Sequence, residues 1–160
     1  MQRNHLTSLF LAAAMSLAIA HARAADSAPS KPEVASPLAG ARALIAEKKW
    51  AAAIDELKRV NDAGSADWNN LMGYSLRKGK TPDYSAAEKY YDEALRIDPK
   101  HRNALEYSGE LYLMTDKLAQ AEQRLAVLDK VCTFGCEQYT DLKKAVQSYK
   151  ANGNRYVAAQ

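Results

Sequence analysis

The sequence is poor in the residue types that build catalytic and metal-binding sites. It has two cysteines and three histidines in 160 residues, and of the three histidines only His101 lies beyond residue 24. No C-x-x-C or C-x-x-C-H motif and no nucleophile motif accompanies it. Glu106 and Glu110, four residues apart, are expected on a solvated helix face, and His101 is expected to be exposed. The sequence therefore predicts a protein that is not an enzyme and needs no cofactor or metal.

The sequence also lacks runs of one charge. It has 22 basic and 19 acidic residues. Two of the basic residues, Arg3 and Arg23, belong to a predicted leader, so the remaining chain has 20 basic and 19 acidic residues and a net charge of +1. No cluster of lysine and arginine suited to a phosphate backbone remains, so nucleic acid is not expected as a partner.

Long apolar runs are scarce as well, and the one at Leu6–Ala20 is too short to span a membrane. It follows the basic Arg3 and precedes the small-x-small sequence Ala22-Arg23-Ala24, a pattern typical of a secretory signal peptide. We expect residues 1–24 to be cleaved after Ala24, which predicts a periplasmic or secreted protein without stable membrane insertion. Residues 25–36 are rich in Ser, Pro and Ala and are expected to form a flexible linker.

The rest of the chain carries an internal repeat. Ala53, Ala87 and Ala121 recur every 34 residues, each early in an amphipathic stretch. A period of this length is typical of stacked helical hairpins, which bury their apolar faces only against their neighbours. The pattern predicts a domain at 37–151 with three hairpins, at about 37–62, 66–97 and 102–131.

Small residues also mark the first helix of each hairpin. Ala41, Gly73 and Gly109 occupy equivalent positions, where the two helices of a hairpin are expected to cross closely. Glycine inside a helix costs about 1 kcal/mol relative to alanine, so Gly73 and Gly109 are expected to serve packing. The second hairpin is longer by two residues, which fits a longer turn at Gly79-Lys80-Thr81-Pro82.

On these residues the chain resembles the tetratricopeptide-repeat family. The pattern is clearest as Gly73, Leu76, Tyr84, Ala87, Tyr91, Ala94 and Pro99, and it extends over about residues 35–133. The resemblance implies an all-α fold, a right-handed solenoid of three tetratricopeptide-type hairpins followed by a C-terminal capping helix. It also implies a scaffold that binds a peptide segment or helix of another protein in a concave groove.

In this family the first helix of each hairpin lines the groove. By register, the resemblance places the following residues there: Arg42, Ile45, Asp67, Asn70, Tyr74, Arg77, Lys78, Asn103, Glu106, Glu110, Leu113 and Met114. Some members grip a C-terminal carboxylate with a lysine, asparagine and arginine clamp. This chain has Leu71 and Tyr107 at two of those positions, so clamp binding of that type is not expected.

The end of the chain departs from the repeat. Residues 137–150 carry one apolar face and are expected to form a helix that covers the last hairpin, followed by a loose tail at 152–160. Self-association through the solenoid ends is a further hypothesis for the role of the protein.

Cys132 and Cys136 lie between the last hairpin and the expected cap. In an exported protein such a pair most often forms a structural disulfide. The alternative is a helical scaffold that carries a metal or redox site at these two cysteines, with Met114 and His101 as conceivable helpers.

Overall fold

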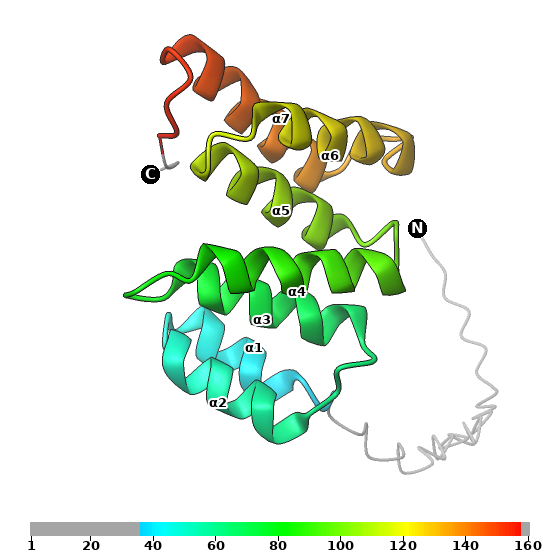
Figure 1. Ribbon diagram of the computed structural model, residues 1–160. Coiled ribbons are helices and arrows are strands. Elements are labelled where there is room, and N and C mark those ends of the chain that lie inside the picture. Colours follow the sequence, from blue (N-terminus) through cyan, green and yellow to red (C-terminus); the bar gives the residue numbers. More distant parts are fainter. Residues whose placement is uncertain (1–35, 158–160) are drawn as a thin grey trace, which may run out of the picture. The chain divides into compact units, whose positions relative to one another are not determined.

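The computed structural model describes residues 36–157, so the predicted signal peptide and nearly all of the predicted linker lie outside the described residues. Within this range the chain forms seven helices and no strand (Figure 1). The helices are α1 (Ala39–Ala46), α2 (Trp50–Val60), α3 (Ala66–Lys78), α4 (Tyr84–Ile97), α5 (Arg102–Met114), α6 (Leu118–Val131) and α7 (Glu137–Ala151).

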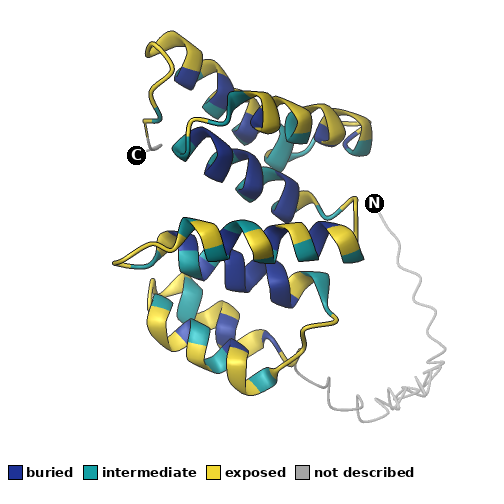
Figure 2. Cartoon of the chain, viewed as in Figure 1, coloured by how far each residue is buried: buried dark blue, intermediate teal, exposed yellow. Residues whose placement is uncertain are grey.

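Consecutive helices pack as hairpins. The pairs are α1 with α2, α3 with α4, and α5 with α6, while α7 contacts both helices of the last pair. The first helices also contact one another in series, from α1 to α3, α5 and α7. The predicted all-α solenoid of helical hairpins is therefore confirmed. Helices α3 and α5 each contact their own hairpin partner and helices on both sides of that hairpin. They are therefore buried along most of their length (Figure 2).

The turns have local causes in the sequence. Lys48 and Asp116 occupy the same place in the first and third hairpin turns, and both adopt the left-handed conformation with φ 57°. The second turn is longer. Asp83 ends it and caps α4, because its Oδ1 accepts a hydrogen bond from the backbone nitrogen of Ala86 at 2.9 Å.

The repeated small residues lie where helices approach most closely. Ala53, Ala87 and Ala121 are fully buried. A Cβ atom on Gly73 would lie 2.8 Å from the ring of Tyr91 in α4, its own hairpin partner. A Cβ atom on Gly109 would instead meet Leu142 of α7 at 2.5 Å. The expectation that Gly109 allows the close crossing of α5 with α6 is thus wrong. This glycine allows the close approach of α7, the capping helix.

The cap is held at both of its ends. Leu142, Val146 and Tyr149 are buried against the third hairpin, and the Tyr149 hydroxyl donates to Asp116 Oδ1 at 3.0 Å. At the start of α7, the sulfur atoms of Cys132 and Cys136 lie at disulfide-bond distance, with their Cα atoms 5.6 Å apart.

The segment after α7, residues 152–157 of the expected tail, is exposed except at one side chain. Tyr156 is partly buried and packs against the core of the third hairpin and the cap. A tyrosine can bury its ring and keep its hydroxyl near water, which gives this short segment an anchor. None of the helices in residues 36–157 combines the length and apolar character needed to cross a membrane.

Candidate functional site

Three first helices share a concavity. It has a volume of about 260 Å³ and receives residues from α1, α3 and α5. Its lining is Arg42, Ile45, Ala46, Asn70, Leu71, Tyr74, Asn103 and Tyr107. We call this surface, with the adjoining side chains of Arg77, Glu106, Glu110 and Met114, the groove. Its place on the first helices agrees with the register that the family resemblance implies.

Asn70 supplies an unpaired hydrogen-bonding group to the groove. Asn70 is about 2% exposed, and its Oδ1 atom has no hydrogen-bond partner among the described residues. A buried amide oxygen without a partner costs roughly 1–3 kcal/mol, which a donor from a bound chain would recover. The groove therefore has an acceptor suited to a backbone N–H group.

A polar ladder crosses the N-terminal ends of the first helices. Asp67 of α3 accepts two hydrogen bonds. Its Oδ2 accepts from Arg42 Nη2 of α1 at 2.8 Å, and its Oδ1 lies 2.9 Å from His101 Nε2. His101 Nδ1 accepts from the backbone nitrogen of Ala104 at 3.1 Å, so the Nε2 atom carries the proton and donates to Asp67. The expectation that His101 is exposed is wrong, because it caps α5 with a side chain that is only 12% exposed.

Arg77 lies at the centre of the groove wall between α3 and α5. Its side chain is 2% exposed, and its Nη1 donates to Glu110 Oε2 at 2.6 Å. The guanidinium carbon lies 5.5 Å from the ring centroid of Tyr74 and 5.4 Å from that of Tyr107, within cation–π range. The Met114 sulfur lies 3.9 Å from Nη1. Arg77 is therefore a structural cation that organises the aromatic wall, and only a small part of it is open to a ligand.

The carboxylates of α5 are not the solvated pair that the sequence predicts. Burial, followed by the neighbouring Glu110 and Asp141, raises the pKa of Glu106 to about 8. Arg77 opposes this shift, but its hydrogen bond goes to Glu110. Glu106 is thus half-buried beside other acids and has no hydrogen bond from Arg77, because Arg77 is paired with Glu110.

Tyr107 shares this environment. Burial and the charge of Glu106 raise the pKa of its hydroxyl to about 12, so the ring remains neutral at physiological pH. Its ring centroid lies 4.6 Å from that of Tyr74. The two neutral rings give the groove an apolar surface beside its amide and carboxyl groups.

The other predicted groove residues lie at different depths. Lys78 is exposed at the end of α3, and Asn103 is half-buried, with Oδ1 accepting from Gln138 Nε2 of α7 at 2.9 Å. Leu113 is fully buried in the core of the third hairpin and cap. The expectation that Leu113 lines the groove is wrong, because α5 turns this position toward the core. The binding role of the remaining residues stays a prediction.

Sequence reasoning missed residues that complete the site. The sequence marks Tyr107 only as a departure from a clamp, and it does not place Gln138 or His101 near the groove. The hydrogen-bond partners of His101 and Gln138 lie close to one repeat period away: Asp67 and His101 are 34 residues apart, and Asn103 and Gln138 are 35 apart. Complementary residues at this separation are a signal that could have identified the ladder, because equivalent positions of neighbouring repeats lie side by side.

The cysteine pair does not line the groove. In the part of the chain that the structure describes, no group of three or more His, Cys, Asp or Glu residues is arranged to hold a metal ion. Cys132 and Cys136 join the end of α6 to the start of α7, and Cys136 Sγ accepts from the backbone nitrogen of Tyr139 at 3.4 Å. This position fits a structural link between the last hairpin and its cap.

The raised pKa of Glu106 predicts a pH-dependent stability. In the unfolded chain this carboxyl ionises near its ordinary value of 4.5, whereas in the folded protein it ionises near 8. Between these values the folded state binds more protons, so the free energy of unfolding should fall as pH rises from 5 to 8. We expect a loss on the order of 1–2 kcal/mol after allowing for partial exposure, measured by urea unfolding at several pH values.

Glu106→Gln should remove most of this slope, and Glu122→Gln, at an exposed position of α6, should keep it. A slope that is the same in wild type and Glu106→Gln would contradict the assignment.

Comparison with known proteins agrees with the architecture. Residues 82–131 match a family model described as Tetratricopeptide repeat. The matched segment covers α4, α5 and α6, that is, the second helix of one hairpin and the whole of the next. No curated protein matches the chain significantly.

Proposed function

The chain belongs to the tetratricopeptide-repeat family, and from this premise we propose that it is a periplasmic adaptor whose groove binds a peptide segment or helix of an envelope or exported protein. Repeats of this family suggest a protein–protein interaction scaffold, and such domains are typically non-catalytic. The family match indicates neither the partner segment nor the compartment, and both are proposed here on other grounds.

One observation carries the proposal: three first helices contribute to a single concavity, and Asn70, one of its lining residues, has a buried Oδ1 atom without a hydrogen-bond partner among the described residues. A bound backbone could donate to this oxygen while its side chains pack on the rings of Tyr74 and Tyr107. Arg42 and Asn103 border the same concavity and can hydrogen-bond the carbonyl groups or carboxylates of a partner. The small volume suits one segment rather than a folded domain.

The proposed location rests on the sequence pattern of residues 1–24. The cysteine pair at disulfide-bond distance supports it, because disulfides persist mainly in exported proteins.

Site-specific photo-crosslinking tests the groove. A photoreactive phenylalanine analogue at Asn103 faces the groove, and the same analogue at Gln123, an exposed position of α6, provides the matched control. In the native cells we expect one discrete adduct from position 103 and none from position 123. Tyr107→Ala in the position-103 protein should reduce the adduct about tenfold, because an aromatic contact in a binding surface is commonly worth 1–2 kcal/mol. Equal adducts from both positions, or an adduct unaffected by Tyr107→Ala, would count against the groove.

Fractionation of the same cells tests the compartment. The adaptor hypothesis expects the protein and its adduct in the periplasmic fraction, with Met1–Ala24 removed from the purified chain. An adduct confined to the cytoplasm would overturn the periplasmic part of the proposal.

A further inference from the structure

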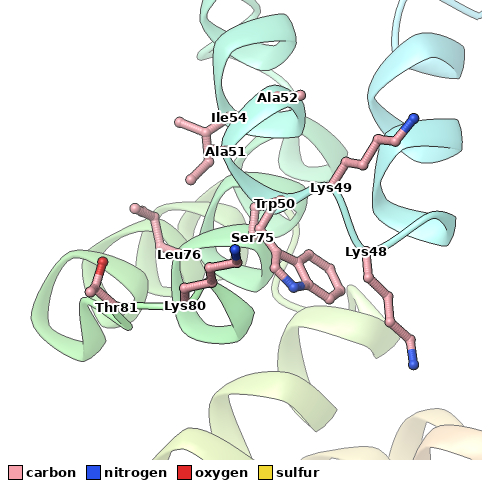
Figure 3. A pocket seen from close by; sticks show the side chains of 11 residues that line it. Lys48, Lys49, Trp50, Ala51, Ala52, Ile54, Ser75, Leu76, Lys80 and Thr81 are labelled. Carbon is pink, nitrogen blue, oxygen red and sulfur yellow. The ribbon is translucent and has the colours of Figure 1, made fainter.

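A second concavity shares no lining residue with the groove. It has a volume of about 550 Å³ and is formed by the turn between α1 and α2, the start of α2, the end of α3 and the turn that follows it (Figure 3). Trp50 lines this cavity, and its ring meets edge-on, at 5.8 Å, the ring of Tyr74, which lines the groove. This volume is within the range of small-molecule pockets.

The cavity has apolar walls and one polar group at depth. Trp50, Ile54 and Leu76 contribute half-buried apolar side chains. Ser75 also lines the cavity and is fully buried, yet its Oγ atom has no hydrogen-bond partner among the described residues. Since buried hydroxyls are usually paired, this oxygen, which is closed to solvent in the free protein, is left for a bound molecule that reaches past the cavity wall.

The rim of the cavity is cationic. Lys48 and Lys49 extend from the first turn, and Lys80 comes from the turn after α3; all three line the cavity (Figure 3). Lys49 pairs with Glu47 at 2.6 Å, whereas Lys48 and Lys80 form no ion pair within residues 36–157. An apolar cavity beneath two uncompensated ammonium groups favours a ligand with an apolar body and a negative end.

We propose that this cavity binds a small amphiphilic carboxylate. Its apolar body packs against Trp50, Ile54 and Leu76. Its carboxylate pairs with Lys80 and accepts a hydrogen bond from the Ser75 hydroxyl, with Lys48 adding longer-range attraction. This site does not depend on the groove or on the proposed adaptor role.

Titration calorimetry with decanoate tests the chemistry of the ligand. We expect decanoate to bind at one site and at least about tenfold more tightly than decanol or decyltrimethylammonium, which share its chain but not its charge. Trp50 gives a second readout, because ligand entry should change its fluorescence, whereas Trp68 is buried with its Nε1 donating to the Leu57 carbonyl. Equal affinity for the three compounds, no binding of decanoate, or binding of an acidic peptide in its place would overturn the proposal.

Variants test the location. Lys48→Gln with Lys80→Gln should weaken decanoate binding about tenfold, and Lys89→Gln, on an exposed part of α4, should leave it unchanged. Ser75→Ala should weaken binding several-fold without destabilising the free protein, since it removes an unpaired buried hydroxyl. Ala51→Glu places a carboxylate on the cavity wall and should abolish binding, while Ala126→Glu, at an exposed position of α6, should not. Binding that survives both Lys48→Gln/Lys80→Gln and Ala51→Glu would place the ligand elsewhere and overturn the proposal.

Discussion

Arg77→Ala is expected to lower the free energy of unfolding by about 3 kcal/mol, a large effect for a residue that the repeat register places in a binding groove. The guanidinium is almost wholly buried and is paired with Glu110 at 2.6 Å. Its removal leaves Glu110 beside Glu106 without their buried cation, and it opens a gap beside the adjacent rings of Tyr74 and Tyr107. Urea unfolding at pH 7 measures the loss.

A double-mutant cycle separates the lost ion pair from the lost packing. Arg77→Met keeps much of the side-chain volume but leaves Glu110 unpaired, so most of the destabilisation should remain. Arg77→Met combined with Glu110→Gln should recover at least about 1 kcal/mol, because a buried pair replaced on both sides costs less than one broken on one side. Arg42→Ala is the matched control: its pair with Asp67 is 45% and 52% exposed, and its removal should cost under about 1 kcal/mol. A stability loss for Arg77→Ala no larger than for Arg42→Ala would contradict the structural role.

This result affects how binding experiments on the groove are interpreted. If Arg77→Ala distorts the wall formed by Tyr74 and Tyr107, loss of partner binding in that variant does not show that Arg77 touches the partner. Tyr107, half-buried on the groove, is the better probe because its ring lines the concavity directly. Substitutions there should change binding with a smaller effect on folding.

The sequence was sufficient to predict the helical hairpins, for a physical reason. Helices can cross closely only where side chains are small. The close crossings therefore require small residues at a regular spacing, which the sequence shows as Ala53, Ala87 and Ala121. Helix ends leave a trace as well, through capping residues such as Asp83. Both signals are local or repeat at a fixed period, and each can be seen without knowing what lies across the interface.

The candidate site was less predictable, because depth depends on the neighbouring repeat. Arg77 and Lys78 are adjacent in the sequence, yet one is buried under α5 and the other is exposed. The pKa of Glu106 depends on Asp141 of α7, which lies outside the repeat pattern. A helix register gives the face on which a residue lies, but only the packing of the next helix decides whether that face meets water.

Gly109 shows the same limit within the core. Its register equals that of Gly73, so the same role was expected for both. In the structure Gly73 faces the partner helix of its own hairpin, whereas Gly109 faces Leu142 of the cap. The third hairpin has a neighbour of a different kind, since α7 is a single helix, and the glycine serves this neighbour.

Gly73→Ala should be the second most damaging of these changes, with a loss of about 2–3 kcal/mol in the free energy of unfolding. The new Cβ would lie 2.8 and 2.9 Å from two ring carbons of Tyr91 and 3.1 Å from the Ala87 carbonyl oxygen. Tyr91 is fully buried, and the carbonyl belongs to the backbone of α4, so neither can move without separating the two helices. Overpacking of this kind outweighs the gain of up to about 1 kcal/mol that alanine brings to a helix.

Gly40→Ala provides the control for that gain. Gly40 is also helical, but its added Cβ would approach only the end of the Glu56 side chain, which can rotate away. Here the helix propensity should dominate, and we expect a neutral effect or a stabilisation of up to about 1 kcal/mol in the same urea experiment. If Gly73→Ala were as stable as Gly40→Ala, the close approach of α3 to Tyr91 would not constrain the hairpin, and the 34-residue pattern of small residues would need another explanation.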